Sequence, residues 1–246
     1  MISEAQREKL AQRLLKPRSR DTGAADPRLL EALARPALSE RLVGVVEALA
    51  DARVIVPLYP HARPDTLEQA REESAALDDA GVTTVALDAT RQAMAVFSSV
   101  DALAAYDPQA RPAPLSVRRA CLMAVAGPAR LLLDGSLAIP RPAVAALAQG
   151  DTWLPAWADT ELGRLIDDAL ADLGISGVRL EPAELARDRI IVPIAAGTED
   201  VRARLTEATR RLGSLERLIV ATDTIEVAPV RAAGRRDGEH TRDTRA

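Results

Sequence analysis

The sequence GVTTVALDATRQAMAVFSSVDALAAYDP, residues 81–108, decides the fold class. Two apolar runs, Val82–Leu87 and Ala93–Phe97, flank a polar loop at Asp88–Gln92. This pattern predicts a β-hairpin whose loop is slightly longer than the tightest type. Directly afterwards, Ser98–Asp101 places a serine three residues ahead of an acid, which predicts a capped helix. A hairpin that leads into a helix gives the rest of the chain a sheet face on which to pack.

The composition indicates a globular protein with an aliphatic core. Hydrophobic residues make up 48% of the 246-residue chain and charged residues 28%, which excludes wholesale disorder. Aromatic residues are only 2%, so the usual stacking platforms for single-stranded nucleic acid are missing. The net charge of −4 gives no overall field toward DNA or RNA, and a nucleic-acid partner is not expected.

The single cysteine, Cys121, excludes an intramolecular disulfide. No apolar run reaches membrane-spanning length, and the N-terminal stretch has no signal-peptide core, so we expect a cytoplasmic protein without a membrane partner.

We expect an α+β fold of two subdomains with mixed β-sheet and packed helices, preceded by an N-terminal helical segment. The predicted units are residues 1–36 (helical segment and linker), 37–158 (α+β), 159–230 (a smaller α/β unit) and 231–246 (a disordered tail). The boundary is placed at Asp151–Ala158, which holds both tryptophans beside a proline.

The apolar periodicity and the turn residues predict the remaining elements. Helices are expected at Ser3–Lys16, from the Asp26-Pro27 start, from Ser39, at Ser116–Val125, at Pro142–Leu147, from Asp159 or Thr160 to Leu173, and at Thr198–Leu212. Strands are expected at Arg53–Leu58, Leu131–Leu133, Leu137–Ile139, Val178–Leu180, Arg189–Ile194, Leu218–Ala221 and Ile225–Val230. The last two are expected to pair around Thr222–Thr224, and Tyr59–Asp79 to be a loop with a partly helical second half.

No residue set in the sequence has the spacing of a catalytic, cofactor or metal site. His61, His240 and Cys121 are too few and too scattered to ligate a transition metal. No glycine-rich phosphate loop is present, and Ser98 and Ser99 are not flanked by a nucleophile-elbow motif. We therefore expect no catalytic residues, no cofactor and no metal, and we interpret Cys121 as a core residue.

Five residues are candidates for a binding surface: Asp88, Arg91, Asp134, Trp153 and Trp157. Each has a structural alternative. Asp88 and Asp134 fall at predicted hairpin turns, where aspartate is favoured for its local backbone bonds. Tryptophan is enriched at binding surfaces, yet a linker tryptophan also pins one subdomain on another.

Three segments in series carry a resemblance to a known family: residues 94–99 (MAVFSS) with the helix that follows, residues 131–135 (LLLDG), and residues 140–150 (PRPAVAALAQG). Together they resemble the N-terminal domain of the SseB (enhanced serine sensitivity protein B) family, in the form common among actinobacteria, over roughly Ala37 to Ala158. The resemblance implies a cytosolic protein of a family without an established biochemical activity, and it offers no catalytic residues to transfer.

These observations favour a non-enzymatic protein-binding or regulatory protein that presents a groove or a sheet edge to an unknown protein partner, with self-association left open. One alternative is a small-molecule sensor or enzyme that uses Asp88, Arg91 and Asp134. Another is an RNA-associated protein that acts through the arginine-containing tail, Arg231–Ala246.

Overall fold

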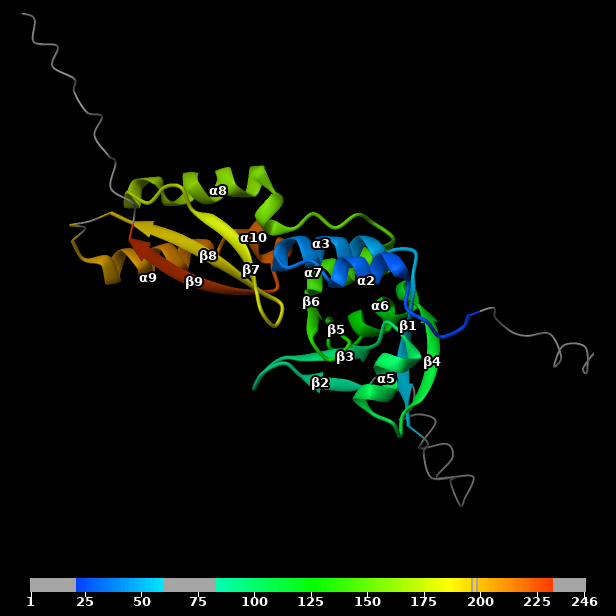
Figure 1. The fold of residues 1–246 in the computed structure, drawn as a ribbon. Helices are drawn as coiled ribbons and strands as arrows, with labels where there is room; N and C mark the ends of the chain where they lie inside the picture. Colours follow the sequence, from blue (N-terminus) through cyan, green and yellow to red (C-terminus); the bar gives the residue numbers. More distant parts are fainter. Residues whose placement is uncertain (1–20, 60–82, 196, 198, 232–246) are drawn as a thin grey trace, which may run out of the picture.

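The computed structural model describes residues 21–59, 83–195, 197 and 199–231. The predicted helix at Ser3–Lys16, nearly all of the Tyr59–Asp79 segment and all but the first residue of the 231–246 tail lie outside these residues. Within them the protein has the expected α+β class (Figure 1).

The first part of the chain combines helices with two small sheets (Figure 1). Its elements are α2 (Pro27–Leu33), α3 (Leu38–Leu49), β1 (Arg53–Leu58), β2 (Thr84–Ala86), β3 (Gln92–Val96), α5 (Val100–Tyr106), β4 (Arg111–Ser116), α6 (Val117–Val125), β5 (Leu131–Leu133), β6 (Leu137–Ile139) and α7 (Arg141–Gln149). One sheet has the order β2-β3-β5-β6, and β1 pairs with β4 in the other.

The second part continues from η1 (Ala156–Ala158), a turn of 3-10 helix, and forms a three-stranded sheet of order β7-β8-β9. Its elements are α8 (Thr160–Leu170), η2 (Ala171–Leu173), β7 (Arg179–Ala183), β8 (Arg187–Ile194), α9 (Val201–Leu212), α10 (Glu216–Ala221) and β9 (Thr224–Arg231). Strand β7 is antiparallel to β8, whereas β9 is parallel to β8.

The hairpin in the opening segment forms as predicted. Strands β2 and β3 pair antiparallel, with Thr84 opposite Met94. The capping serine is one residue later than expected: the Ser99 side chain accepts a hydrogen bond from the backbone N–H of Ala102 at 3.0 Å and starts α5. Ser98 is buried instead.

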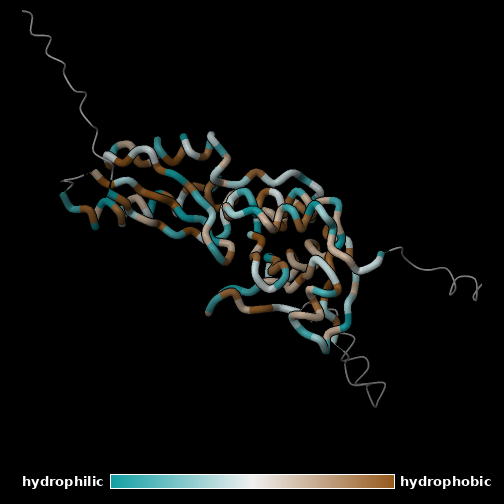
Figure 2. The backbone as a smooth tube through the Cα atoms, in the orientation of Figure 1, coloured by the Kyte–Doolittle hydropathy of each residue, from teal (hydrophilic) through white to brown (hydrophobic). Residues whose placement is uncertain are grey.

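Alternation along β3 divides the apolar residues between the two faces of the larger sheet. Met94 and Val96 join the first hydrophobic core, which is built with α2, α3, α6 and α7. Ala95 points into a smaller cluster with Phe97, and Ala93 into one with Ala186 of the β7–β8 turn. The hydrophobic positions in Figure 2 accordingly lie along the strands and on the inner sides of the helices.

A second hydrophobic core lies between the three-stranded sheet and its helices. Ile166 of α8, Leu212 of α9 and Leu218 of α10 all contact the cluster that holds Ile190 and Val192 of β8. Because Ile190 and Val192 share one face of the strand, these three helices cover the same face of the sheet.

One element prediction is wrong, and one strand was not predicted. Leu218–Ala221 belongs to helix α10 rather than to a strand, so β9 has no hairpin partner there and pairs with β8. A four-residue apolar run does not distinguish a buried strand from a short helix. The segment around Pro112 and Pro114, for which no strand was predicted, forms β4.

The geometry of β1 explains why β4 tolerates these prolines. Ile55 of β1 exchanges both backbone hydrogen bonds with Phe97, each 2.8 Å long, on the side away from β4. In antiparallel pairing the residue opposite Ile55, Pro114, therefore turns its own backbone groups away from β1, and Pro112 two residues earlier does the same. A proline at such an edge position removes no hydrogen bond from the ladder.

Several predicted helix starts use different caps. Ala37 precedes α3 in place of Ser39, and Ser116 precedes α6 without accepting a side-chain hydrogen bond. Helix α9 starts at Val201, and Thr198 lies outside the described residues. Asp26 and Asp159 do cap α2 and α8, as predicted.

Candidate functional site

A groove lies where the C-terminal half of α3, the end of α7 and the segment after α7 meet. Its volume is about 440 Å³. Val43, Val46, Leu147 and Trp153 supply its apolar lining, and we call it the Trp153 groove. Gly150 shapes it: with a φ of 82° this residue ends α7 in the left-handed region, and the chain turns so that the following residues border α3.

The charged lining of the Trp153 groove is mostly acidic. Glu47, Asp51 and Asp151 contribute three exposed carboxylates, against one guanidinium from Arg118. The Arg118 Nε donates to the backbone oxygen of Ala148 at 3.2 Å, which holds this side chain against the last turn of α7. The net formal charge of these four side chains is −2, since three negative charges face one positive charge.

Two helix C-termini add to this negative potential. Glu47 lies in the last turn of α3 and Asp51 just beyond it, while Asp151 follows the end of α7. Neither helix has a basic residue in its last turn. Because the C-terminal end of a helix carries a partial negative charge that basic residues usually offset, the Trp153 groove favours a cation.

Trp153 brings an aromatic wall and an unused donor. Its ring meets Trp157 edge-on, with the ring centroids 5.5 Å apart and the planes at 85°, and both rings pack against the first core. The Trp153 Nε1 is buried and has no acceptor within the part of the chain that the structure describes. A buried N–H without an acceptor costs about 1–3 kcal/mol.

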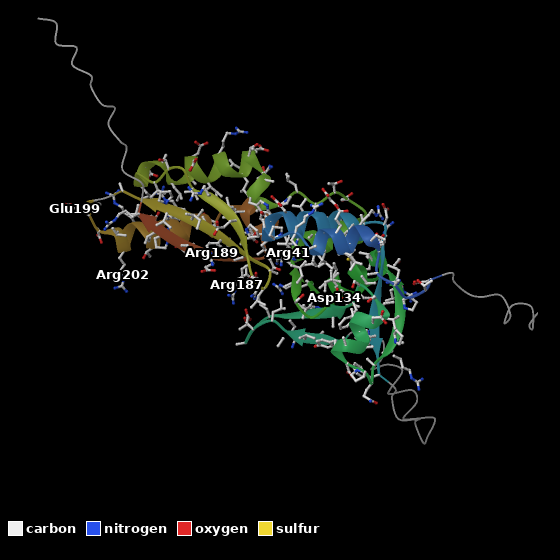
Figure 3. The ribbon with its side chains drawn as sticks, in the orientation of Figure 1. Arg41, Asp134, Arg187, Arg189, Glu199 and Arg202 are labelled. Atoms are coloured by element: carbon white, nitrogen blue, oxygen red, sulfur yellow. The ribbon has the colours of Figure 1, made fainter. Side chains whose placement is uncertain are left out.

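Asp88 and Arg91 lie where the β2–β3 loop contacts the β7–β8 hairpin. Arg91 is 8% exposed; it donates to the Asp88 carboxylate at 2.7 and 2.8 Å and to the backbone oxygen of Leu185 at 2.9 Å. Arg187, labelled in Figure 3, donates to the same carboxylate at 3.1 Å. The hydrogen bond from Arg91 holds the pKa of Asp88 well below its ordinary value. These contacts join the two parts of the molecule, and a binding role for Asp88 and Arg91 stays a prediction.

Asp134 serves a different contact. It lies in the β5–β6 turn with a φ of 49°, followed by Gly135 at 66°, as the Asp-Gly pair predicts. Its carboxylate accepts a hydrogen bond from the backbone N–H of Ser98 at 2.7 Å. Because Asp88 precedes β3 whereas Asp134 follows the parallel strand β5, the two carboxylates lie at opposite ends of these strands.

The sequence interpretation missed a polar cluster around Asp223, between the two cores. The Asp223 side chain is 0% exposed; it accepts from Arg130 Nε at 2.7 Å and from the backbone N–H of Arg141 at 2.9 Å. The backbone N–H of Asp223 donates to Asp188 at 3.0 Å, and burial raises the pKa of Asp188 to about 6. These residues are 35 to 93 positions apart, so no local pattern connects them.

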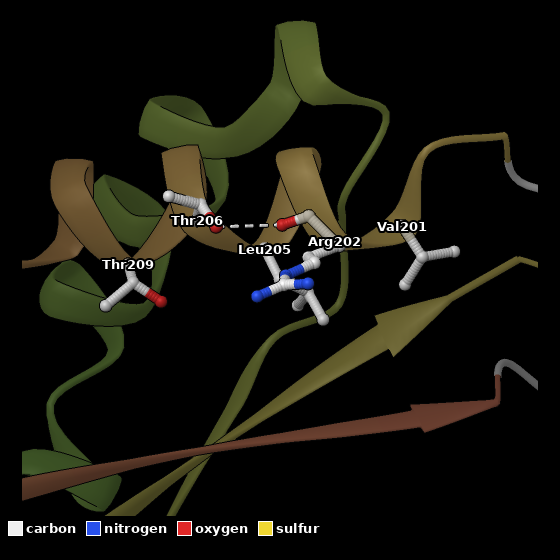
Figure 4. A pocket seen from close by; sticks show the side chains of 5 residues that line it. All are labelled: Val201, Arg202, Leu205, Thr206 and Thr209. Carbon is white, nitrogen blue, oxygen red and sulfur yellow. Dashed lines mark hydrogen bonds between the residues drawn. The ribbon is translucent and has the colours of Figure 1, made fainter.

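A second hollow runs along α9 in Figure 4, with a volume of about 580 Å³. It is lined by Val201, Arg202, Leu205, Thr206 and Thr209. The Thr206 hydroxyl donates to the Arg202 backbone oxygen at 2.9 Å, so it is engaged within the helix. Since this hollow draws on one helix and has one charged side chain, it offers less to a ligand than the Trp153 groove.

Among the described residues, no group of three or more His, Cys, Asp or Glu side chains has the arrangement of a metal site. Within the same ranges, no helix is long and apolar enough to cross a bilayer.

Comparison with known proteins yields one match. Residues 28–146 match the family model of the SseB protein N-terminal domain, which supports the SseB family for this part of the chain. Neither a curated protein nor a solved structure matches the chain.

Proposed function

We propose that this chain, with an SseB N-terminal domain over residues 28–146, is a non-enzymatic protein-binding or regulatory protein. Its partner would be a protein that inserts a basic, partly apolar segment into the Trp153 groove. The observation that carries the proposal is the convergence of two helix C-termini and three carboxylates around an apolar floor. The proposal includes a cytoplasmic location and the actinobacterial form of the family.

The chemistry of the groove supports this type of partner. An arginine or lysine side chain can place its alkyl part against Val46 and Leu147 while its charge meets Glu47 and Asp51. The Trp153 ring can add a cation–π contact.

The environments of the other candidate residues support a role without catalysis. Asp88 and Arg91 bind each other and the second sheet, and Asp134 binds the backbone of Ser98. A general base needs a lone pair free for substrate, and both Asp88 oxygens already accept hydrogen bonds, from the backbone and from Arg91 and Arg187. We keep the division into units 37–158 and 159–230 as part of the proposal, with Trp153 and Trp157 as binding residues at its junction.

Affinity capture of the full chain at its native level, followed by mass spectrometry, tests this proposal. The groove variant Glu47→Gln/Asp51→Asn/Asp151→Asn removes all three negative charges and changes no apolar contact. Glu199→Gln is a control that removes one exposed negative charge outside the groove, since Glu199 lies two residues before α9 (Figure 3). We expect one basic partner with the wild type and the control, and its loss from the groove variant. Capture of the same partner by the groove variant and by the wild type would refute the proposal.

A second candidate function is a small-molecule sensor, because about 440 Å³ falls within the usual range of ligand sites. Thermal-shift measurements with amino acids and nucleotides separate the two candidates. A ligand of the folded state raises the melting temperature by mass action, about 2.7 kcal/mol of stability at 100 times Kd. A melting temperature that none of these compounds changes would contradict the sensor.

A further inference from the structure

The start of the described chain is held by Arg53 of β1 and by the first residue of α5. The Asp21 carboxylate accepts from Arg53 Nε at 2.6 Å, and Gly23 accepts from the backbone N–H of Val100 at 2.9 Å. Arg53 follows the groove residue Asp51 by only two positions, a span of at most about 7 Å between their Cα atoms. The residues before Asp21 therefore join the protein at Arg53, two positions along the chain from Asp51 of the groove.

The composition of residues 1–20 is complementary to that groove. Its basic side chains are Arg7, Lys9, Arg13, Lys16, Arg18 and Arg20. Glu4 and Glu8 oppose them, so six positive charges less two negative charges leave +4. Both lysines of the chain and three leucines, at positions 10, 14 and 15, fall in this stretch. The segment thus has the basic and apolar character that the groove favours.

We propose that residues 1–20 dock into the Trp153 groove of their own chain. Leucine side chains of the segment fill the apolar floor, and its arginine and lysine side chains meet Glu47, Asp51 and Asp151. Lys16 is five residues before Asp21, and five extended residues span up to about 17 Å, more than twice the span of about 7 Å that separates Arg53 from Asp51. Short tethering also gives an effective concentration in the millimolar range, so a weak intrinsic affinity is enough.

The regulatory consequence rests on the proposed function, because a groove filled by this segment is closed to a partner. A partner must then displace residues 1–20, and changes that weaken docking increase its apparent affinity. The docking itself requires no partner and is tested without one.

The test uses the full chain labelled at Gln12→Cys with bimane, a dye that tryptophan quenches on contact. Cys121 does not compete for the label, because it is fully buried and burial raises its pKa to about 12. With an effective concentration of about 1 mM and an intrinsic Kd of about 100 μM, about nine-tenths of the segment is docked. We therefore expect strong quenching that Trp153→Phe/Trp157→Phe relieves; both rings are replaced because their centroids are 5.5 Å apart and either could quench the dye.

Charge variants keep the quencher in place and separate docking from changes in the tryptophan. We expect Glu47→Gln/Asp51→Asn/Asp151→Asn to restore the emission, and Glu199→Gln to leave it quenched. Sodium chloride at about 1 M shortens the Debye length to about 3 Å and should restore it as well.

Emission that is equal in the wild type and Trp153→Phe/Trp157→Phe would overturn the docking. Quenching that appears only at high protein concentration would also overturn it, because the occupant would then be the segment of a second copy. If affinity capture yields a basic partner but the bimane dye is not quenched, the docking is refuted and the proposed function stands. If the dye is quenched but no partner is captured, the proposed function is refuted and the docking stands.

Discussion

Replacing Asp223 by asparagine is expected to weaken the connection between the two hydrophobic cores. The wild-type carboxylate is 0% exposed and accepts hydrogen bonds from Arg130 of the first part and from the backbone N–H of Arg141. Arg130 is itself only 15% exposed at its side chain. The asparagine has a similar shape but no charge and one acceptor oxygen, so the guanidinium keeps its burial and loses its counter-ion.

The structure sets the size of the effect. Removing one partner of a buried ion pair costs about 3–5 kcal/mol. The remaining exposure of Arg130 and the surviving amide oxygen both reduce that cost, so we expect about 2–3 kcal/mol. A hydrogen bond to a charged group is worth about 1.5–3 kcal/mol, which gives a similar figure for the loss of one such bond.

Urea denaturation followed by tryptophan fluorescence measures this loss. Trp153 and Trp157 are the only tryptophans and both pack on the first core. Far-UV circular dichroism reports both parts of the chain. We expect Asp223→Asn to lower the free energy of unfolding. We also expect the fluorescence and circular dichroism curves to have different urea midpoints, because the second sheet loses a main contact with the first part.

Glu226→Gln is the matched control. Glu226 pairs with Arg189 at 3.5 Å on the surface, where both side chains are more than a third exposed. Surface pairs of this kind contribute about 0–1 kcal/mol. A loss below about 1 kcal/mol for Asp223→Asn, equal to that of this control, would refute the reasoning that burial makes the Arg130–Asp223 pair important.

Three further predictions concern single side chains. Phe97 is 1% exposed, so Phe97→Ala should cost about 3–5 kcal/mol in chemical denaturation, and a cost below about 1 kcal/mol would contradict its place in the core. Asp134→Ala should cost about 1–3 kcal/mol, because the Ser98 N–H loses its acceptor and alanine is disfavoured at the positive φ of residue 134, whereas Asp134→Asn should retain most of the stability. The pKa of Asp188 is about 6 in the folded protein against an ordinary 3.8, so the folded protein binds this proton more tightly than the unfolded chain does. The stability of the folded protein therefore falls as pH rises from about 4 to about 6. Asp188→Asn should therefore gain stability over the wild type above pH 6 and not near pH 4, and a gain independent of pH in urea titrations would contradict this assignment.

The elements that the sequence predicted correctly have local causes. The hairpins around Asp88–Arg91 and Asp134–Ser136 follow from apolar runs and turn residues, and Asp26 and Asp159 cap their helices through neighbouring N–H groups. Leu218–Ala221 was misassigned because its four apolar residues fit either period. The pairing of β9 with β8 depends on α9 and α10 between them, which no local pattern reports.

The candidate site was predictable only in part. The position of both tryptophans beside a proline singled out Trp153, and the structure places it in a groove. The acidic wall was missed, because Glu47, Asp51 and Asp151 come together only when α3 and α7 end at the same place. In the sequence, Glu47 and Asp51 are ordinary surface acids of a helix end.

The prolines of β4 have a consequence for association between copies of the chain. Growth of a sheet by strand addition needs an uninterrupted row of outward N–H donors on the exposed edge. Pro112 and Pro114 turn their backbone toward that edge and supply no donor. A strand of a neighbouring molecule would therefore find no N–H donor at two successive outward-facing residues of β4. Any homo-oligomer must be built from side-chain contacts or from another strand.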